Sequence, residues 1–207
     1  KNSLIGFARL NSVNVALVCN QPSIMGGSLD CDASDKMARF IRFCDCFDIP
    51  LITLVDVPAF FPGKKQEHAG IIRHGAKLLY AYSDATVPKI SVILRKAYGG
   101  AYIAMDIGAD IVYAWPISEI AVMGAEGAAN VVFKNRILSA ENPENEKKEC
   151  IEEYEKHFLN PYLAAKFGFI SEVIKPDETR ERLISALSML KNKKSETINR
   201  KHGNIPL

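Results

Sequence analysis

The feature that most constrains the fold of this 207-residue chain is an order of segments that occurs three times. Each time, a short and mostly apolar stretch leads into a loop that carries glycine and then into a segment with helical spacing. The apolar stretches cover residues 51–55, 89–94 and 119–122. Such stretches are typical of strands buried on both faces of a parallel sheet. Their alternation with helices predicts an α/β fold with layered helices.

Other segments extend this pattern. We expect further strands at residues 13–19, 111–114 and, at the edge of the sheet, 170–174. We expect helices beginning after Asp32 and Ser34, which are good N-cap residues, and over residues 70–83 and 176–192. The Glu-, Asn- and Lys-rich segment 139–156 reads as an exposed connection or a polar helix.

The helix predicted over residues 70–83 has one apolar face. Its members are Ile71, Ile72, Gly75, Leu78, Leu79 and Tyr82. His74 falls opposite this face, beside Arg73 and Lys77, and is expected at the surface.

Composition excludes several classes of protein. Hydrophobic residues make up 48% and charged residues 24%, which favours a soluble globular chain with one substantial core. The net charge of +2 gives no indication of nucleic-acid binding or of an anionic membrane surface. No apolar run is long enough to cross a bilayer. Because the chain opens with Lys1, it reads as a fragment or a processed chain.

The five cysteines argue against a disulfide framework and for a reducing compartment. Cys44 and Cys46 are two residues apart and no second pair follows, so no metal site is expected.

The glycine pair in Gly99-Gly100-Ala101 has two readings. The first amides of a helix have no internal acceptor, so they can hold an anionic oxygen that approaches the glycine backbone. Alternatively, the pair is only a tight turn needed for packing. Gly124 and Gly127 have the same two readings, and their spacing is not a dinucleotide-binding fingerprint. No nucleophile triad stands out.

Five longer runs of sequence are distinctive: residues 56–63 (DVPAFFPG), 70–81 (GIIRHGAKLLYA), 95–102 (RKAYGGAY), 119–128 (EIAVMGAEGA) and 201–207 (KHGNIPL). Together they resemble one family, the carboxyltransferase (β) subunits of biotin-dependent acyl-CoA carboxylases of the propionyl-CoA carboxylase type. The resemblance covers essentially the whole chain, from residue 6 onward.

The resemblance implies a crotonase (ClpP/crotonase-like) fold of repeated ββα units. It implies that residues 1–207 form the C-terminal domain of a two-domain subunit, without the N-terminal domain that supplies most of the acyl-CoA site. In the family, the active site lies between the N-domain of one subunit and the C-domain of another within a hexameric ring. The chain alone would then hold half a site.

The resemblance also implies roles for residues. The amides of Gly100 and Ala101 would form the catalytic oxyanion hole on the biotin side. The biotin-binding residues would be Gly99, Gly100, Ala101, Phe61 and Gly63, and the acyl-CoA-binding residues Tyr102, Ile103, Gly124 and Gly127. Biotin, carried on a partner protein, would supply the base, so no protein triad is required.

The implied substrate is an acyl-CoA of the propionyl or acetyl class. The implied partners are a biotin carboxylase or biotin carrier subunit and further copies of the chain in a homo-oligomer, without nucleic acid or membrane insertion. The location would be cytoplasmic, or the mitochondrial matrix if the protein is eukaryotic.

The chain departs from the family pattern in places. Ala59 replaces a usual glycine, so its loop is less free to adopt positive φ. Ile103 stands where some propionyl-preferring members carry Asp; it indicates altered or broader acyl choice, or is a plain core residue. Residues 106–108 look shorter than the family's segment, and residues 134–139 look irregular.

Four other functions stay open. The nearest is the α subunit of a biotin-dependent, sodium-pumping decarboxylase acting on methylmalonyl-CoA or glutaconyl-CoA. A transcarboxylase is also compatible. A crotonase-type hydratase is disfavoured, because no pair of carboxylates stands out at the glycine loops. The chain could also be an assembly domain without activity of its own.

Overall fold

The fold is built on one seven-stranded sheet, and the computed structural model describes residues 1–195 and 201–206. The strands are β1 (Ser3–Leu10), β2 (Val13–Asn20), β3 (Leu51–Val57), β4 (Lys89–Tyr98), β5 (Ile111–Ala114), β6 (Glu119–Ala121) and β7 (Glu172–Val173). They run in the order β1-β2-β3-β4-β5-β7, and β6 pairs with β4. Among the strands of the described residues, only the β1–β2 pairing is antiparallel. The predicted parallel sheet is confirmed, but residues 119–122 are not a fully buried strand, because β6 is half-buried and Val122 is 75% exposed.

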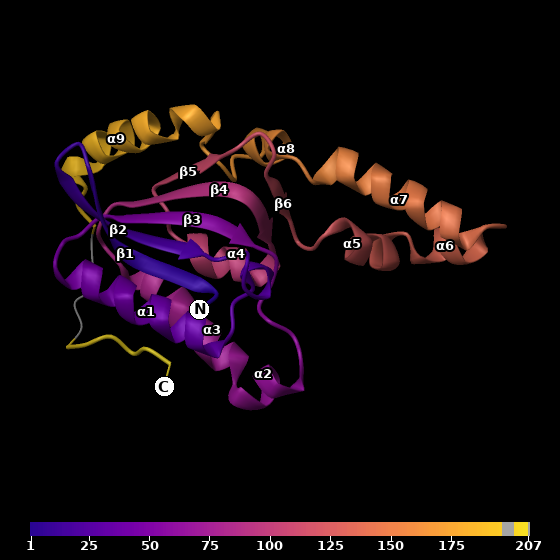
Figure 1. Cartoon of the computed structure of the whole chain (residues 1–207), viewed down its shortest axis with the longest axis horizontal. Helices are drawn as coiled ribbons and strands as arrows, with labels where there is room; N and C mark the ends of the chain where they lie inside the picture. The colour runs from indigo at the N-terminus through magenta and orange to yellow at the C-terminus, as the bar shows by residue number, and fades with distance from the viewer. Residues whose placement is uncertain (196–200, 207) are drawn as a thin grey trace.

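Helices cover both faces of the sheet (Figure 1). The α-helices are α1 (Cys31–Cys46), α2 (Lys64–Ala69), α3 (Ile71–Asp84), α4 (Gly99–Asp106), α5 (Ala125–Val132), α6 (Lys134–Ser139), α7 (Pro143–Phe158), α8 (Pro161–Lys166) and α9 (Thr179–Met189). Short 3-10 turns are η1 (Met25–Gly27), η2 (Pro176–Glu178) and η3 (Leu190–Asn192). None of the helices among the described residues is long and apolar enough to cross a membrane.

Two cores form because the strands are apolar on both faces. On one face α1, α3 and α4 bury side chains such as Met37, Leu78 and Met105 against the sheet. On the other face α9 buries Leu183 and Leu187. The helix predicted over residues 176–192 is therefore present, although it begins and ends in 3-10 turns.

The start of α1 differs from the prediction. Asp30, not Asp32 or Ser34, is the N-cap, and its side chain accepts a hydrogen bond from the Ala33 amide at 2.8 Å. Its Oδ1 also accepts from the side chain of Asn2 at 3.2 Å, which ties the helix start to the beginning of β1. Asp32 is exposed in the first turn, and Ser34 is buried within the helix.

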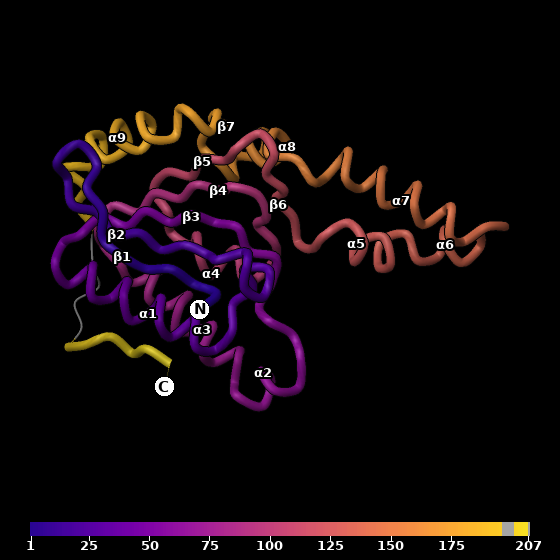
Figure 2. Tube along the Cα trace, in the orientation of Figure 1, coloured from indigo at the N-terminus to yellow at the C-terminus, as the bar shows by residue number. Residues whose placement is uncertain are grey.

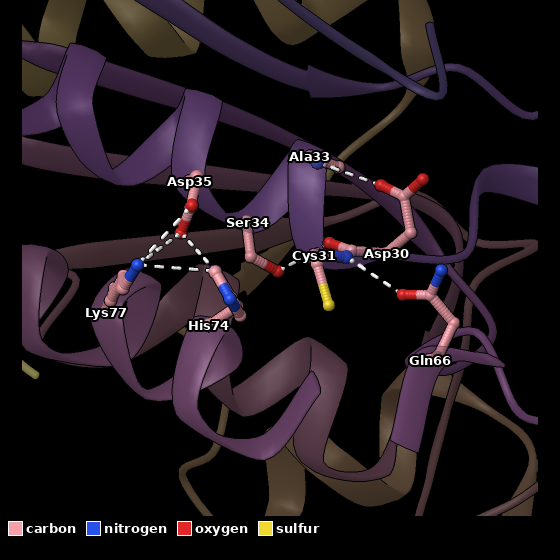
Figure 3. A network of polar contacts seen from close by, with 8 residues as sticks. All are labelled: Asp30, Cys31, Ala33, Ser34, Asp35, Gln66, His74 and Lys77. Atoms are coloured by element: carbon pink, nitrogen blue, oxygen red, sulfur yellow. Dashed lines mark hydrogen bonds and ion pairs between the residues drawn. The ribbon is translucent and has the colours of Figure 1, made fainter. Parts of the chain in front are cut away.

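The orientation of α3 also differs from the prediction. His74 is not a surface residue: its side chain is 17% exposed and lies 2.8 Å from Asp35 of α1. Lys77 approaches the same carboxylate at 3.2 Å, so three polar side chains join the two helices (Figure 3). Ile72, expected on the apolar face, is 80% exposed, and Leu79 is 37% exposed.

The polar segment 139–156 is mostly helix. It contributes α7, which with α5 and α6 forms an arm that projects from the sheet (Figure 2). Arg136 of α6 fixes the arm through Glu146 and Glu153 of α7, at 2.5 and 2.7 Å. Residues 134–139, which look irregular in sequence, form helix α6.

The capping of α1 gives a testable expectation. Replacement of Asp30 by alanine (Asp30→Ala) removes an acceptor for the first-turn amides and should lower the free energy of unfolding by about 1 to 2 kcal/mol. The matched control Asp32→Ala should change it by less than about 0.5 kcal/mol, because Asp32 makes no cap. Urea denaturation of both variants measures the difference. Equal losses would contradict the assignment of Asp30 as the cap.

Candidate active site

The candidate site begins where β4 turns directly into α4. Gly99 makes this turn with φ of +55°. A Cβ atom at Gly99 would lie 2.8 Å from the backbone oxygen of Val122, which follows β6. The Val122 backbone therefore leaves no room for a side chain. Only glycine fits this position without strain.

The next two residues present the free end of a helix. No side chain caps the amino-terminal turn of α4. A Cβ atom at Gly100 would meet no atom within 4 Å, so the space beside its backbone is open. Ala101, by contrast, buries its side chain in the core. Open backbone next to uncapped amides is an arrangement that can hold an anionic oxygen.

A largely apolar groove of about 630 Å³ runs beside this turn. Gly99, Tyr102 and Ile103 line it from α4, and Ile120, Ala121 and Val122 from the β6 region. The opposite wall comes from α7, α8 and the residues after α8: Tyr154, Phe158, Leu163, Ala164, Phe167 and Phe169. Ile103 is 52% exposed, so it is not a core residue. The groove can hold an apolar group next to the glycine turn.

Asp106 is the one carboxylate among the described residues that line the groove. Its Oδ2 accepts a hydrogen bond from the hydroxyl of Tyr102 at 2.8 Å, whereas its buried Oδ1 has no hydrogen-bond partner among the described residues. Burial raises the pKa of Asp106 to about 6, against the lowering effect of the Ser91 and Tyr102 hydroxyls. The carboxyl group therefore exchanges its proton close to neutral pH.

Tyr98, the residue before Gly99, links the turn to β6 and to the start of α5. Its hydroxyl donates a hydrogen bond to Glu119 of β6, and burial together with this carboxylate raises the pKa of Tyr98. The Tyr98 ring also packs against Gly124, where a Cβ atom would approach it to 3.3 Å. Glu119 thus has a structural partner, and Glu126 is exposed in the first turn of α5.

The structure brings together only some of the predicted site residues. Gly99, Gly100, Ala101, Tyr102 and Ile103 are consecutive at the start of α4. Gly124 is the N-cap of α5 and Gly127 is exposed in its first turn; neither is among the groove-lining residues.

The remaining predicted pair, Phe61 and Gly63, lies in the exposed loop before α2. This loop leaves the sheet beside the glycine turn, because Val57 of β3 pairs with Ala97 of β4. Ala59 in the same loop does not adopt positive φ, whereas Gly63 does, at +121°. The alanine is therefore tolerated without backbone strain.

Two parts of the site were missed by sequence reasoning. Asp106 was noted only as part of a short segment, and α4 does pass to β5 through just four residues, 107–110. The aromatic wall of α7 was missed because its segment is mostly charged. The signal was present: Tyr154 and Phe158 are four residues apart, on one face of a helix, and their rings are 5.1 Å apart.

Groups of three or more His, Cys, Asp or Glu side chains that could hold a metal ion are absent from the described part of the chain. All five cysteines are free.

Comparison with known proteins gives a consistent result. The family model described as the carboxyl transferase domain matches residues 1–205. A propionyl-CoA carboxylase carboxyltransferase subunit of Haloferax mediterranei is 56% identical over 210 residues, which is all of this chain and 41% of that protein. The α subunit of methylmalonyl-CoA decarboxylase from Propionigenium modestum is 53% identical over 210 residues, with the same two shares.

A solved structure, the transcarboxylase 12S hexamer with methylmalonyl-coenzyme A and methylmalonic acid bound, superposes with a TM-score of 0.96 at 57% identity. The match covers all of this chain and 40% of that one. The predicted crotonase-type fold is thereby confirmed. The chain spans about two fifths of the length of the relatives it matches, 41% and 40% in these examples.

The raised pKa of Asp106 predicts a pH-dependent stability. The native chain keeps this proton to higher pH than the unfolded chain, so the free energy of unfolding falls as pH rises from about 4 to about 6. Asp106→Asn cannot ionise and should be more stable than the parent chain above pH 6, by about 2 to 3 kcal/mol, and similar at pH 4.

Urea denaturation at pH 4.5 and pH 7.5 measures this effect. Glu152→Gln, on the exposed surface of α7, is the matched neutralisation and should behave like the parent chain at both pH values. A stability difference for Asp106→Asn that is the same at both pH values would contradict the assignment.

Proposed function

The chain belongs to the carboxyl transferase domain family, and we propose that it forms the biotin side of an enzyme that transfers a carboxyl group between biotin and an acyl-CoA. The observation that carries this proposal is the open, uncapped amide turn of Gly100 and Ala101 at the end of an apolar groove. A carboxyl transfer needs stabilisation of an anionic oxygen, and amides fixed in space do this without reorganisation.

Each residue has a task in this mechanism. The amides of Gly100 and Ala101 hold the oxygen of the biotin ring, and Gly99 keeps side-chain atoms out of its path. Biotin, when bound, supplies the carrier of the carboxyl group and a basic ring nitrogen. The groove walls exclude water from the reacting groups, and Tyr102 and Ile103 contact the acyl group.

The remainder of the site lies outside this chain in our proposal. We assign residues 1–207 to the C-terminal domain of a longer subunit, whose N-terminal domain supplies most of the acyl-CoA site and its own oxyanion hole. The relatives' greater length supports this division. The subunits would form a hexameric ring, as in the transcarboxylase 12S structure, and a biotin carboxylase or biotin carrier would be the partner.

Acyl choice follows from the groove. Ile103 contributes a half-exposed apolar side chain to the groove lining, against which a short apolar acyl group of the propionyl or acetyl class would pack. Gly124 and Gly127 would contact the CoA portion only across a partner subunit, because they do not line the groove. The free cysteines favour a reducing compartment, and we place the enzyme in the cytoplasm or, in a eukaryote, the mitochondrial matrix.

Decarboxylation of a dicarboxylic acyl-CoA is the second candidate. Methylmalonyl-CoA decarboxylase α subunits that are 53% and 54% identical to the chain make it compatible, although the carboxylase and transcarboxylase relatives at 56% to 58% are more similar. The same amide turn would serve either direction, because the anionic oxygen is the same.

The test of function uses the full-length subunit with its biotin-bearing partner. We expect transfer of labelled carboxyl from bicarbonate to propionyl-CoA or acetyl-CoA that requires ATP. Loss of carboxyl from methylmalonyl-CoA without ATP would move the assignment to the decarboxylase. Exchange of label between two thioesters without ATP would identify a transcarboxylase. No transfer to or from any thioester would refute the proposal.

The amide turn is tested by Gly100→Pro, which removes one amide hydrogen at a first-turn position of α4, where proline is tolerated. The expected result is a loss in kcat of about 100- to 1000-fold. Gly100→Ala keeps the amide and adds a methyl group in open space, so it reports on steric blocking alone. Circular dichroism of both variants verifies folding. Unchanged activity of folded Gly100→Pro would support an assembly role instead.

A further inference from the structure

The segment between β3 and the body of α3 exposes an unusual set of side chains. Lys64, Lys65 and His68 are exposed on α2, and Arg73 is exposed in the first turn of α3. In the described part of the chain, none of these four forms a hydrogen bond to an acceptor or an ion pair with a carboxylate.

The four cations lie close together in sequence, with Glu67 as the only acidic residue of α2. The chain as a whole has a net charge of only +2. Elsewhere, several cations are paired, for example Arg95 with Asp56 and Lys193 with Asp110. The unpaired cations of α2 therefore give this region a local positive potential that can attract an anionic partner.

Two apolar side chains are exposed in the same segment. Ile72 is 80% exposed beside Arg73, and Phe61 is 37% exposed three residues before Lys64. Apolar anchors within a polar rim are common in protein–protein contacts. Below, Phe61, Lys64, Lys65, His68, Ile72 and Arg73 are called the α2 surface.

The α2 surface is held rigidly. Gln66 of α2 accepts a hydrogen bond from the Cys31 amide at the start of α1, at 3.1 Å (Figure 3). The preceding loop is fixed on Leu29, whose amide donates to Ala59 at 3.0 Å and whose carbonyl accepts from Phe61 at 2.8 Å. A surface fixed before binding loses less entropy on association than a flexible one.

The sheet register places this surface at the same end of the molecule as the glycine turn. Val57 at the end of β3 pairs with Ala97, two residues before Gly99. The loop that leads to α2 therefore leaves the sheet next to the start of α4. A partner that docks on the α2 surface lies within a short reach of Gly100.

The shape of the region indicates which anionic partner it takes. Small-molecule sites are concave, but α2 has no buried residue and protrudes from the helical layer (Figure 1). The α2 surface contributes neither to the groove of about 630 Å³ nor to a second cleft of about 700 Å³ between the β1–β2 turn and α9. This geometry favours a protein over the phosphates of CoA.

We propose that the α2 surface is the docking site for an acidic face of the biotin-carrying partner protein. The inference rests on the proposed function and specifies how biotin is delivered. Positive charge on α2 speeds and orients encounter with the carrier, and Ile72 and Phe61 provide apolar contact. Apart from Phe61, which the resemblance assigns to biotin binding, the surface takes no part in the transfer step itself.

The experiment uses charge reversal in the full-length subunit. Lys64→Glu/Lys65→Glu is compared with Lys191→Glu/Lys194→Glu, which makes the same change in net charge at exposed positions after α9. Transfer is measured with the biotin carrier protein and, separately, with free biotin. We expect the first variant to raise KM for the carrier about tenfold at low salt, and the difference to shrink in high salt. The control variant and all reactions with free biotin should be unaffected.

Other results would overturn the inference. Equal loss with free biotin would place the lysines in the reaction site, and a raised KM for acyl-CoA would make them a phosphate site. A change in the mass of the oligomer, measured by light scattering, without a change in KM for the carrier would assign the surface to a contact between copies of the subunit. An unchanged carrier KM refutes docking outright.

A direct binding titration of the carrier to each variant separates the inference from the proposed function. If the parent subunit transfers no carboxyl group with either form of biotin, the proposed function fails. The titration still decides docking: about tenfold weaker binding of Lys64→Glu/Lys65→Glu alone supports it, and equal binding of all three proteins refutes it.

Discussion

The parallel pairing of β4 with its neighbours is the constraint on which the site depends. β4 pairs with β3 on one side and with β5 and then β6 on the other, so its carboxyl end is surrounded by the ends of β3 and β6. The chain must therefore leave β4 between two backbones. Gly99 makes this exit possible, because it adopts positive φ and has no side chain to clash with the carbonyl of Val122. The direction of α4, and with it the exposure of the Gly100 amide, follows from that single turn.

The buried carboxyl group of Asp106 lowers the free energy of unfolding of the chain. The Oδ2 atom of Asp106 accepts a hydrogen bond from Tyr102, whereas its buried Oδ1 atom has no hydrogen-bond partner among the described residues. A core built only for stability would replace such a group with an apolar one. Its retention in the wall of the groove is what one expects where stability and ligand recognition make different demands.

Sequence reasoning predicted the elements whose burial is complete and failed where orientation depends on distant contacts. The strands at residues 51–55, 89–94 and 111–114 were predicted because a strand buried on both faces must be apolar throughout. The cap of α1 was misplaced, because the choice of Asp30 depends on Asn2, the residue before the edge strand β1. His74 was assigned to the surface because helical spacing does not reveal that α1 brings Asp35 to it. For the site, spacing located the glycine turn, but Asp106 and the aromatic wall need tertiary structure to be recognised.

The two walls of the groove differ in local stability, because one of them belongs to the arm of α5, α6 and α7. One wall is the start of α4, anchored in the sheet, whereas Tyr154 and Phe158 belong to a helix that packs mainly on α5 and α6. Elements with few contacts to the main core unfold locally at a lower free energy than the sheet does. A molecule that fills the groove touches both walls at once, so it couples the arm to the sheet. By this linkage, filling the groove stabilises the folded arm, so the amides of the arm exchange their hydrogens more slowly as groove occupancy rises.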